Sequence, residues 1–171
     1  MNSGCGSLHW ANMANTVLLR EMLHDDLEIL FNQQLDPEAN WMAAFTSENP
    51  ADRAAFDEHW RRIMSNPSIM RRTIISNGQV AGYVSKYMNE GRPEVTYWIG
   101  REFWGRGIAS SALSQFLSIM VERPVFARAA KDNFASYRVL EKCGFAIIGE
   151  GSGYANARRA DTGEYIMQLI H

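Results

Sequence analysis

The chain has 171 residues, of which 46% are hydrophobic and 21% are charged, and its formal net charge at pH 7 is −2. This length and composition predict one soluble globular domain with a sizeable core. They argue against a membrane protein, because no apolar run reaches the roughly 18–20 residues that a helical span needs. The negative charge also argues against nucleic acid as the main partner, since such binding depends on a broad cationic surface.

Residues 1–13 are predicted to be a flexible tail, which leaves residues 14–171 as a single domain. The tail lacks the basic and then apolar pattern of a signal peptide. The two cysteines, Cys5 and Cys143, suit neither a disulfide framework nor a metal site. We therefore expect a cytoplasmic protein that holds no metal.

The first third of the chain is mostly helical in pattern. A first strand is predicted at residues 16–20. Three helical stretches follow, over 24–35, from Asp36-Pro37 onward, and over 50–64, because their apolar residues recur at helical spacing. Asn66-Pro67 ends the third stretch, since proline disfavours helical backbone in the residue before it.

The clearest local prediction is a β-hairpin. Residues 69–76 and 79–88 are rich in strand-forming side chains, and Asn77-Gly78 between them favours a type I′ turn. A second turn at 89–93 leads to a third strand over 94–99. The three strands together form an antiparallel meander.

The remaining elements complete an α+β order. They are a helix over 108–120 that Pro124 closes, a strand over 125–130, a helix between an N-cap at Asn133 and Gly144, a strand over 145–149, a glycine-rich link over 149–154, and a strand over 164–170.

Residues 98–109 carry the strongest chemical signal. A strand runs into a glycine turn, which opens directly onto an apolar-periodic helix, so several backbone N–H groups and the positive helix end point at one place. Gly105 and Gly107 let an anion approach the backbone, which suits a phosphate. The turn lacks the Gly-Lys-Ser/Thr of a nucleotide P-loop, and Ser110 breaks the Rossmann spacing. Taken alone, the same pattern also fits an ordinary turn.

A second segment, residues 133–145, reads Asn-Phe-Ala-Ser-Tyr-Arg-Val-Leu-Glu-Lys-Cys-Gly-Phe. Together with 98–109 it resembles the GNAT N-acetyltransferase superfamily, and within it the RimJ/RimL type of ribosomal-protein N-terminal acetyltransferase. The family motif Q/R-x-x-G-x-G/A falls on Trp104, Gly107 and Ala109. Tryptophan in the first position departs from the general pattern but is similar to the RimJ/RimL branch.

The resemblance implies the GNAT fold, a mixed central sheet of about six to seven strands flanked by helices, with strands 4 and 5 splayed around acetyl-CoA. It also implies which residues hold the acetyl-CoA. These are Tyr97, Trp98, Ile99, Trp104, Gly105, Arg106, Gly107, Ile108, Ala109, Ser110, Asn133 and Ser136. Residues 101–142 hold seven Lys/Arg against four acids, and this net charge of +3 suits a polyanionic ligand.

Acetyl transfer to an amine requires the amine to be neutral. A lysine-like amine has a pKa of about 10.4 and a peptide α-amine one of about 8, so a weak or water-mediated base suffices for an N-terminal amine. Glu94 is the candidate base, because it matches the glutamate of the family's Glu-x-x-Tyr-Trp stretch. The alternative is that Glu94 is an ordinary surface residue, and His59 is a rival base.

The candidate acid for the leaving thiolate is Ser136. Many GNAT enzymes place a tyrosine four residues before the glycine of Gly-Phe, but here that position is Leu140. The serine of Asn-x-x-Ser is the acid that the RimJ/RimL resemblance implies, and the alternative is that Ser136 only hydrogen-bonds the acetyl-CoA. Cys143 is disfavoured as a nucleophile, because its apolar surroundings raise a thiol pKa.

The candidate acceptor-site residues are Trp41, Phe45, Trp60 and Tyr154. Aromatic residues at helical spacing also fit a hydrophobic core. The sequence leaves the acceptor open among a protein N-terminus, an amino acid and another small amine, and a homodimer is common in such families. The competing interpretation is a non-catalytic module that binds acyl-CoA as a sensor or scaffold.

Overall fold

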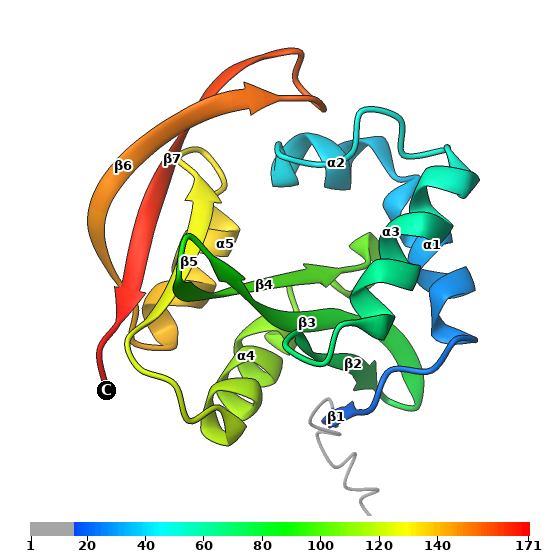
Figure 1. The fold of residues 1–171 in the computed structure, drawn as a ribbon, viewed down its shortest axis with the longest axis horizontal. Helices are drawn as coiled ribbons and strands as arrows, with labels where there is room; N and C mark the ends of the chain where they lie inside the picture. The colour runs from blue at the N-terminus through cyan, green and yellow to red at the C-terminus, as the bar shows by residue number, and fades with distance from the viewer. Residues whose placement is uncertain (1–15) are drawn as a thin grey trace, which may run out of the picture.

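Within residues 16–171, seven strands form one mixed sheet, and helices cover both of its faces (Figure 1). The computed structural model describes residues 16–171, so the predicted tail and Cys5 lie outside the described residues. The strand order is β1-β2-β3-β4-β5-β7-β6. The strands are β1 Val17–Arg20, β2 Met70–Ser76, β3 Gln79–Asn89, β4 Arg92–Ile99, β5 Val125–Ala130, β6 Ala146–Ala155 and β7 Ala160–Leu169.

The helices are α1 Asp26–Gln34, α2 Pro37–Ala43, α3 Arg53–Ser65, α4 Ile108–Ile119 and α5 Phe134–Lys142, with a 3-10 turn η1 at Arg101–Phe103. Their order confirms the predicted α+β class. The predicted second and third helices begin at capped positions, since the side chains of Asp36 and Asp52 accept hydrogen bonds from Ala39 N and Ala55 N. None of the described helices is long and apolar enough to cross a membrane.

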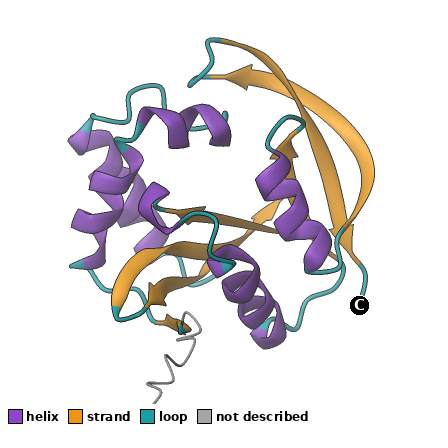
Figure 2. Cartoon of the chain, turned by 180° about the vertical axis from the view of Figure 1, so that it is seen from behind, coloured by secondary structure: helices purple, strands orange, loops and turns teal. Residues whose placement is uncertain are grey.

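Two hydrophobic clusters hold the helices to opposite faces of the sheet. The larger cluster lies under α4, whose predicted apolar stripe is confirmed: Ile108, Leu113 and Phe116 are at most 1% exposed. Figure 2 shows the same fold from behind the view of Figure 1. The smaller cluster lies under α1 and α3 and is centred on Phe56 and Trp60. Each fully buried side chain of this size contributes roughly 1.5–3 kcal/mol to folding.

The predicted hairpin is confirmed with its turn. Asn77 and Gly78 both have positive φ, 49° and 80°, as a type I′ turn requires. β3 then pairs antiparallel with β4, which completes the predicted meander.

The glycine-rich link predicted at 149–154 is wrong, because these residues continue strand β6. β6 and β7 form one long hairpin that turns at residues 156–159, with Gly151 opposite Glu164 and Gly153 opposite Thr162. Glycine in every second position makes the segment resemble a loop in composition, but pairing along the whole of β7 overrides that local preference. The longer hairpin carries the β6–β7 turn up to the neighbourhood of α2 (Figure 1).

Candidate active site

The site lies where β4 and β5 separate. Neighbouring strands elsewhere in the described sheet pair antiparallel, but β4 and β5 run parallel and share only the pair Glu94↔Phe126. Beyond Glu94, the β5-facing edge of β4 has no strand partner within residues 16–171. The predicted splaying of these two strands is therefore confirmed. Such an edge presents backbone N–H and C=O groups to which an extended ligand can bind.

The glycine turn has the conformation that the sequence predicts. Gly105 and Gly107 have φ of +72° and +73°, in the left-handed region, and Gly107 is the N-cap residue of α4. A Cβ built on either glycine would meet nothing within 4 Å. The space in front of this backbone is therefore open.

Unpaired backbone donors face that open space. Within residues 16–171, the N–H groups of Ile108, Ala109 and Ser110 contact no hydrogen-bond acceptor; the first helical bond runs from Ser111 N to Gly107 O, at 3.1 Å. The helix end is therefore positively polarised and uncapped by any side chain. This arrangement fits a phosphate group.

The two arginines near the turn differ in what they contact. Arg101 pairs with Asp36 and Glu38. Arg106 is exposed, lies with its guanidinium 5.9 Å from the Phe103 ring centre, and contacts no carboxylate within the described part of the chain. Arg106 is therefore the side chain at this turn that is free to meet an anion.

Trp104 fastens the turn to the strand before it. Its indole N–H donates to Ile99 O at 2.9 Å, while 38% of the residue stays exposed. Trp98, by contrast, keeps its Nε1 buried and without a hydrogen-bond partner in residues 16–171. The backbone of both Trp98 and Ile99 lies on the splayed part of β4.

Asn133 joins α5 to α2. Its Oδ1 accepts from Ser136 N at 3.1 Å, which confirms the predicted N-cap, and its Nδ2 donates to Met42 O at 3.0 Å. Much of its hydrogen-bonding capacity is thus used within the protein. The residue orders the start of α5, where Ser136 lies.

Ser136 contacts Tyr97 across the opening between the strands. The two hydroxyl oxygens are 2.8 Å apart. Burial raises the pKa of the Tyr97 phenol to about 12, although the hydrogen bond with Ser136 opposes that rise. The phenol therefore stays protonated at neutral pH. The sequence predicts that the backbone of Tyr97 binds acetyl-CoA, but it does not predict the contact between the Tyr97 side chain and Ser136.

Glu94, the candidate base, is only 5% exposed and has three hydrogen-bond donors around it. Tyr87 Oη donates to Oε1 at 2.9 Å, Asn89 Nδ2 donates to Oε2 at 2.9 Å, and Arg128 Nε lies 3.3 Å from Oε2. Arg128 also binds Glu164 at 2.8 Å. The sequence indicated the glutamate and missed these partners, although Tyr87 follows from the hairpin register, which pairs it with Glu94.

Glu94 and Tyr97 project from opposite faces of β4. Val95 and Tyr97 pack with the α4 cluster, and alternation along a strand sends Glu94 to the other face. Tyr87, its cross-strand partner, lies on the same face as Tyr83, which packs with the α1–α3 cluster. The candidate base and the candidate acid are therefore on opposite sides of the sheet.

His59 and Cys143, the two other residues considered, lie in surroundings unlike those of Glu94 and Ser136. His59 is exposed on α3, where its ring meets the Trp60 ring edge-on; partial burial of the imidazole and the nearby Arg62 lower its pKa. Cys143 is half-buried, its Sγ lies 3.6 Å from Ser110 O, and burial raises the pKa of the thiol. Among residues 16–171, no three His, Cys, Asp or Glu side chains gather as a metal site requires.

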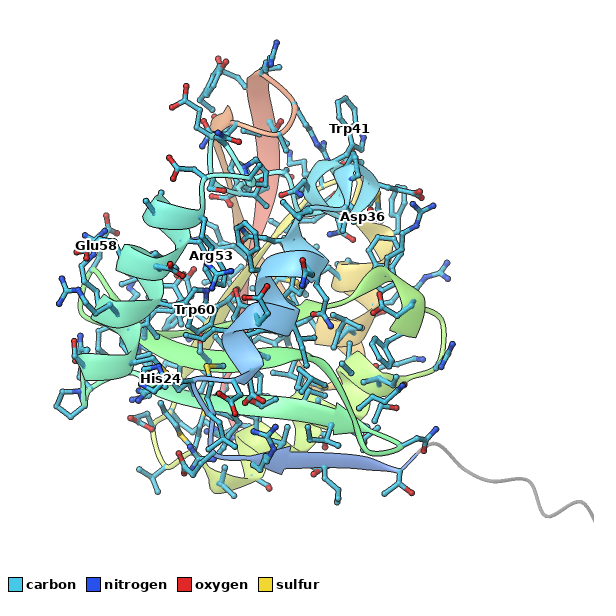
Figure 3. All side chains as sticks on the ribbon, turned by 90° about the vertical axis from the view of Figure 1, so that its right-hand side faces the viewer. His24, Asp36, Trp41, Arg53, Glu58 and Trp60 are labelled. Carbon is cyan, nitrogen blue, oxygen red and sulfur yellow. The ribbon has the colours of Figure 1, made fainter. Side chains whose placement is uncertain are left out.

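The four candidate acceptor residues separate into two groups. Trp60 is 3% exposed and packs against Phe56 and Tyr83, so it belongs to the core (Figure 3). Trp41 is 53% exposed and stands out from α2, with Arg158 over its ring. Phe45 and Tyr154 are also exposed.

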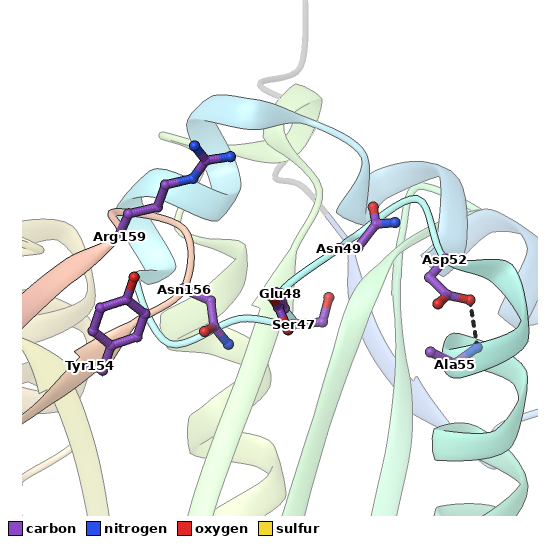
Figure 4. A pocket seen from close by; sticks show the side chains of 8 residues that line it. All are labelled: Ser47, Glu48, Asn49, Asp52, Ala55, Tyr154, Asn156 and Arg159. Carbon is purple, nitrogen blue, oxygen red and sulfur yellow. Dashed lines mark hydrogen bonds between the residues drawn. The ribbon is translucent and has the colours of Figure 1, made fainter.

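Tyr154 lines a cavity of about 650 Å³ between the loop after α2 and the β6–β7 turn (Figure 4). The turn is bound both to the loop and to α2, since Asn156 Nδ2 donates to Thr46 O at 2.8 Å and Arg158 Nε donates to Trp41 O at 3.0 Å. The lining is mostly polar. It consists of Ser47, Glu48, Asn49, Asp52, Ala55, Tyr154, Asn156 and Arg159.

Comparison with known proteins gives a consistent result. Residues 16–146 match the family model "Acetyltransferase (GNAT) domain". The chain is 28% identical over 131 residues to the Bacillus subtilis (strain 168) protein named "Putative ribosomal N-acetyltransferase YdaF", which covers 68% of this chain and 71% of that relative.

Solved structures share the fold at low sequence identity. Spermidine N-acetyltransferase from Vibrio cholerae, in complex with CoA and spermine, matches with a TM-score of 0.74 at 18% identity, over 90% of this chain and 95% of the other. RimL, a ribosomal L7/L12 alpha-N-protein acetyltransferase in complex with coenzyme A, matches with a TM-score of 0.73 at 20% identity, over 90% and 94% of the two chains. At these identities the likeness of both structures to this chain concerns the fold alone.

Proposed function

Because the chain belongs to the GNAT acetyltransferase domain family and is an N-acetyltransferase, we propose that it transfers an acetyl group from acetyl-CoA directly to a primary amine, with both substrates bound together. The splayed β4–β5 pair beside an uncapped helix start is the observation that carries this proposal. The solved neighbours named above were bound to CoA, which supports the same class of ligand.

The described residues fit acetyl-CoA. The free N–H groups of Ile108, Ala109 and Ser110 would bind the pyrophosphate, and the open space over Gly105 and Gly107 gives it room. The unpaired edge of β4 would pair with the amide-bearing arm of the ligand as an added strand does. Ser136 would then meet the thioester end.

The opposite faces of β4 suggest how the two substrates approach. Ser136 and Tyr97 lie on the α4–α5 side, and Glu94 faces the α1–α3 side. We assign the leaving thiolate to the first side and the incoming amine to the second. Because Glu94 is buried and both of its oxygens already accept hydrogen bonds, we propose that it takes the amine proton through a water.

The acceptor is proposed to be a protein N-terminus, an amino acid or another small amine. A peptide α-amine with a pKa of about 8 is about half neutral at that pH, so it needs no strong base. This suits Glu94, a carboxylate whose two oxygens already accept hydrogen bonds. The names of the relatives include ribosomal-protein and spermidine acetyltransferases. The cavity beside Tyr154 is the candidate entrance for the amine.

Thiol release from acetyl-CoA, followed with a panel of amines and short peptides, tests this function. Amine-dependent release with an acetylated product supports the enzyme, and the best amine gives the substrate class. Calorimetry on the same protein shows whether acetyl-CoA binds at all. Binding without release for every amine would favour the alternative, a non-catalytic acyl-CoA sensor or scaffold.

A further inference from the structure

The hydroxyl pair of Tyr97 and Ser136 has a consequence for the departure of the thiolate. We propose that Tyr97 is a positioning residue that acts through Ser136: its phenol donates to Ser136 Oγ and leaves the serine proton directed at the sulfur. This inference rests on the proposed acetyl transfer. It goes beyond that proposal by adding a residue whose side chain no motif assigned.

The distance between the two hydroxyl oxygens allows either to donate, and their acidities favour one direction. The 2.8 Å separation of the two oxygens is that of a good O–H···O bond, while the 3.4 Å distance from Tyr97 Oη to Ser136 O is long. A phenol is more acidic than an aliphatic alcohol and so is the better donor. Ser136 Oγ has no other hydrogen-bond partner within residues 16–171, so its own proton remains free.

The location of the pair makes the free proton useful. Tyr97 is on the part of β4 that has left β5, and Ser136 is in the first turn of α5. Two of the surrounding groups are fixed: Asn133 holds Ser136 N at the helix start, and the sheet holds the Tyr97 backbone. When Tyr97 donates to Ser136 Oγ, the serine proton is left to donate to a ligand bound in the opening.

The chemistry balances with this pair as a hydrogen-bond donor. The lone pair of the amine forms the new C–N bond, and the C–S bond breaks with its electron pair going to sulfur. The amine proton passes through water to Glu94 and from there to solvent, and the thiolate takes up a proton from solvent once it has left, so no net proton is needed. Neither hydroxyl is consumed, because a thiolate is a weaker base than an alkoxide or a buried phenolate; the pair stabilises the negative sulfur by a charge-assisted hydrogen bond.

The expected effect is on turnover and not on binding. Tyr97→Phe keeps the ring in the core and removes only the hydroxyl. We expect it to lower kcat by roughly 2- to 10-fold, the range given by one hydrogen bond between neutral groups, with the Kd for acetyl-CoA unchanged. Tyr137→Phe, which removes a phenol from the neighbouring position of α5, is the matched control and should keep wild-type kcat.

A double-mutant cycle provides the decisive comparison. If Tyr97 acts through Ser136, the double variant Tyr97→Phe/Ser136→Ala should have the kcat of Ser136→Ala alone. Losses that multiply would overturn the proposal, as would a Tyr97→Phe enzyme with unchanged kcat. Should Tyr97→Phe fail to fold, site-specific 3-fluorotyrosine at position 97 makes a more acidic phenol, and a lowered kcat would then contradict the proposal. Absence of turnover in the wild-type protein would instead reject the underlying acetyl transfer.

Discussion

Glu94 of β4 and Phe126 of β5 are the pair at which the two parallel strands meet, and beyond this pair the strands diverge. Glu94 is buried at the meeting point, on the face opposite to that of Tyr97. A chain that binds a thioester between the strands would thus have a carboxylate on one side of the sheet and a hydroxyl pair on the other. The predictions below test separate parts of this arrangement.

Glu94→Gln should lower turnover across the pH–rate profile. A general base contributes about 10²-fold or more, so a loss of this size is expected if a water relays the proton to Glu94. The kinetics are measured from pH 5 to 9. Glu164→Gln is the control, since it removes the other carboxylate that binds Arg128. A Glu94→Gln profile identical to that of the wild type would exclude Glu94 as the base.

Asn133→Ala should reduce the free energy of unfolding by about 1 kcal/mol, because the helix α5 loses its side-chain cap. Asn133→Ser keeps an oxygen that can accept from Ser136 N but loses the bond to Met42 O. Urea unfolding of the two variants separates the roles. If Asn133→Ser is no more stable than Asn133→Ala, the side-chain cap is not the source of the stability that Asn133 provides.

Asp26 gives a pH dependence of stability. Burial opposes its charge, but hydrogen bonds from Arg20, Leu23 N and Thr73 outweigh burial and lower its pKa. A lowered folded-state pKa stabilises the protein above the unfolded-state value of about 3.9, and this stability is lost as the pH falls through the folded-state pKa.

Asp26→Asn should therefore cost about 2 kcal/mol at pH 7 and progressively less as the pH falls below 4. Urea unfolding at pH 7 and pH 3 measures both values. Asp57→Asn, which breaks an exposed i,i+4 pair with Arg53, should cost less than about 0.5 kcal/mol at either pH. If the loss of unfolding free energy in Asp26→Asn were the same at pH 7 and pH 3, it would contradict a lowered pKa for Asp26.

Tyr154 and Trp60 should respond differently to truncation. Trp60→Ala should destabilise the protein by about 3–5 kcal/mol, because it empties a core position. Tyr154→Ala should change stability by less than about 0.5 kcal/mol and should raise the KM for the amine while the Kd for acetyl-CoA stays the same. An unchanged amine KM would remove the cavity from the acceptor site.

The sequence predicts the elements whose signals are local. The apolar stripe of α4 and the Asn77-Gly78 turn depend on residues that are near one another in the chain, and both are confirmed. Gly105 and Gly107 before α4 are also a local signal. The tight turn there requires positive φ at both positions, and glycine adopts such values without steric cost.

The contacts within the site join residues that are far apart in the chain, so they could not be predicted from the sequence. Glu94 meets Arg128 only after β4 and β5 are placed side by side, and Tyr97 meets Ser136 only after α5 has folded back across the opening. The prediction of a loop at the glycine-rich part of β6 is wrong for a related reason, because the pairing of this part with β7 is a tertiary effect. Trp60 was an acceptor candidate because periodicity alone cannot say which apolar residue faces a pocket and which faces a core.

The central claim is that the glycine turn binds the phosphates of acetyl-CoA. Gly107→Glu would place a carboxylate in front of the N–H groups of α4, whereas Gly91→Glu would add the same side chain to the β3–β4 turn. Gly107 and Gly91 have φ of +73° and +78°, and a Cβ on either meets nothing within 4 Å, so the two substitutions carry the same backbone strain, roughly 1–2 kcal/mol.

Calorimetric titration of the wild-type protein and these two variants with acetyl-CoA is the most direct measurement. Binding by the wild type and by Gly91→Glu, with none by Gly107→Glu, is the predicted result. Equal affinity in all three proteins would show that the ligand lies elsewhere and would contradict the assignment of the turn.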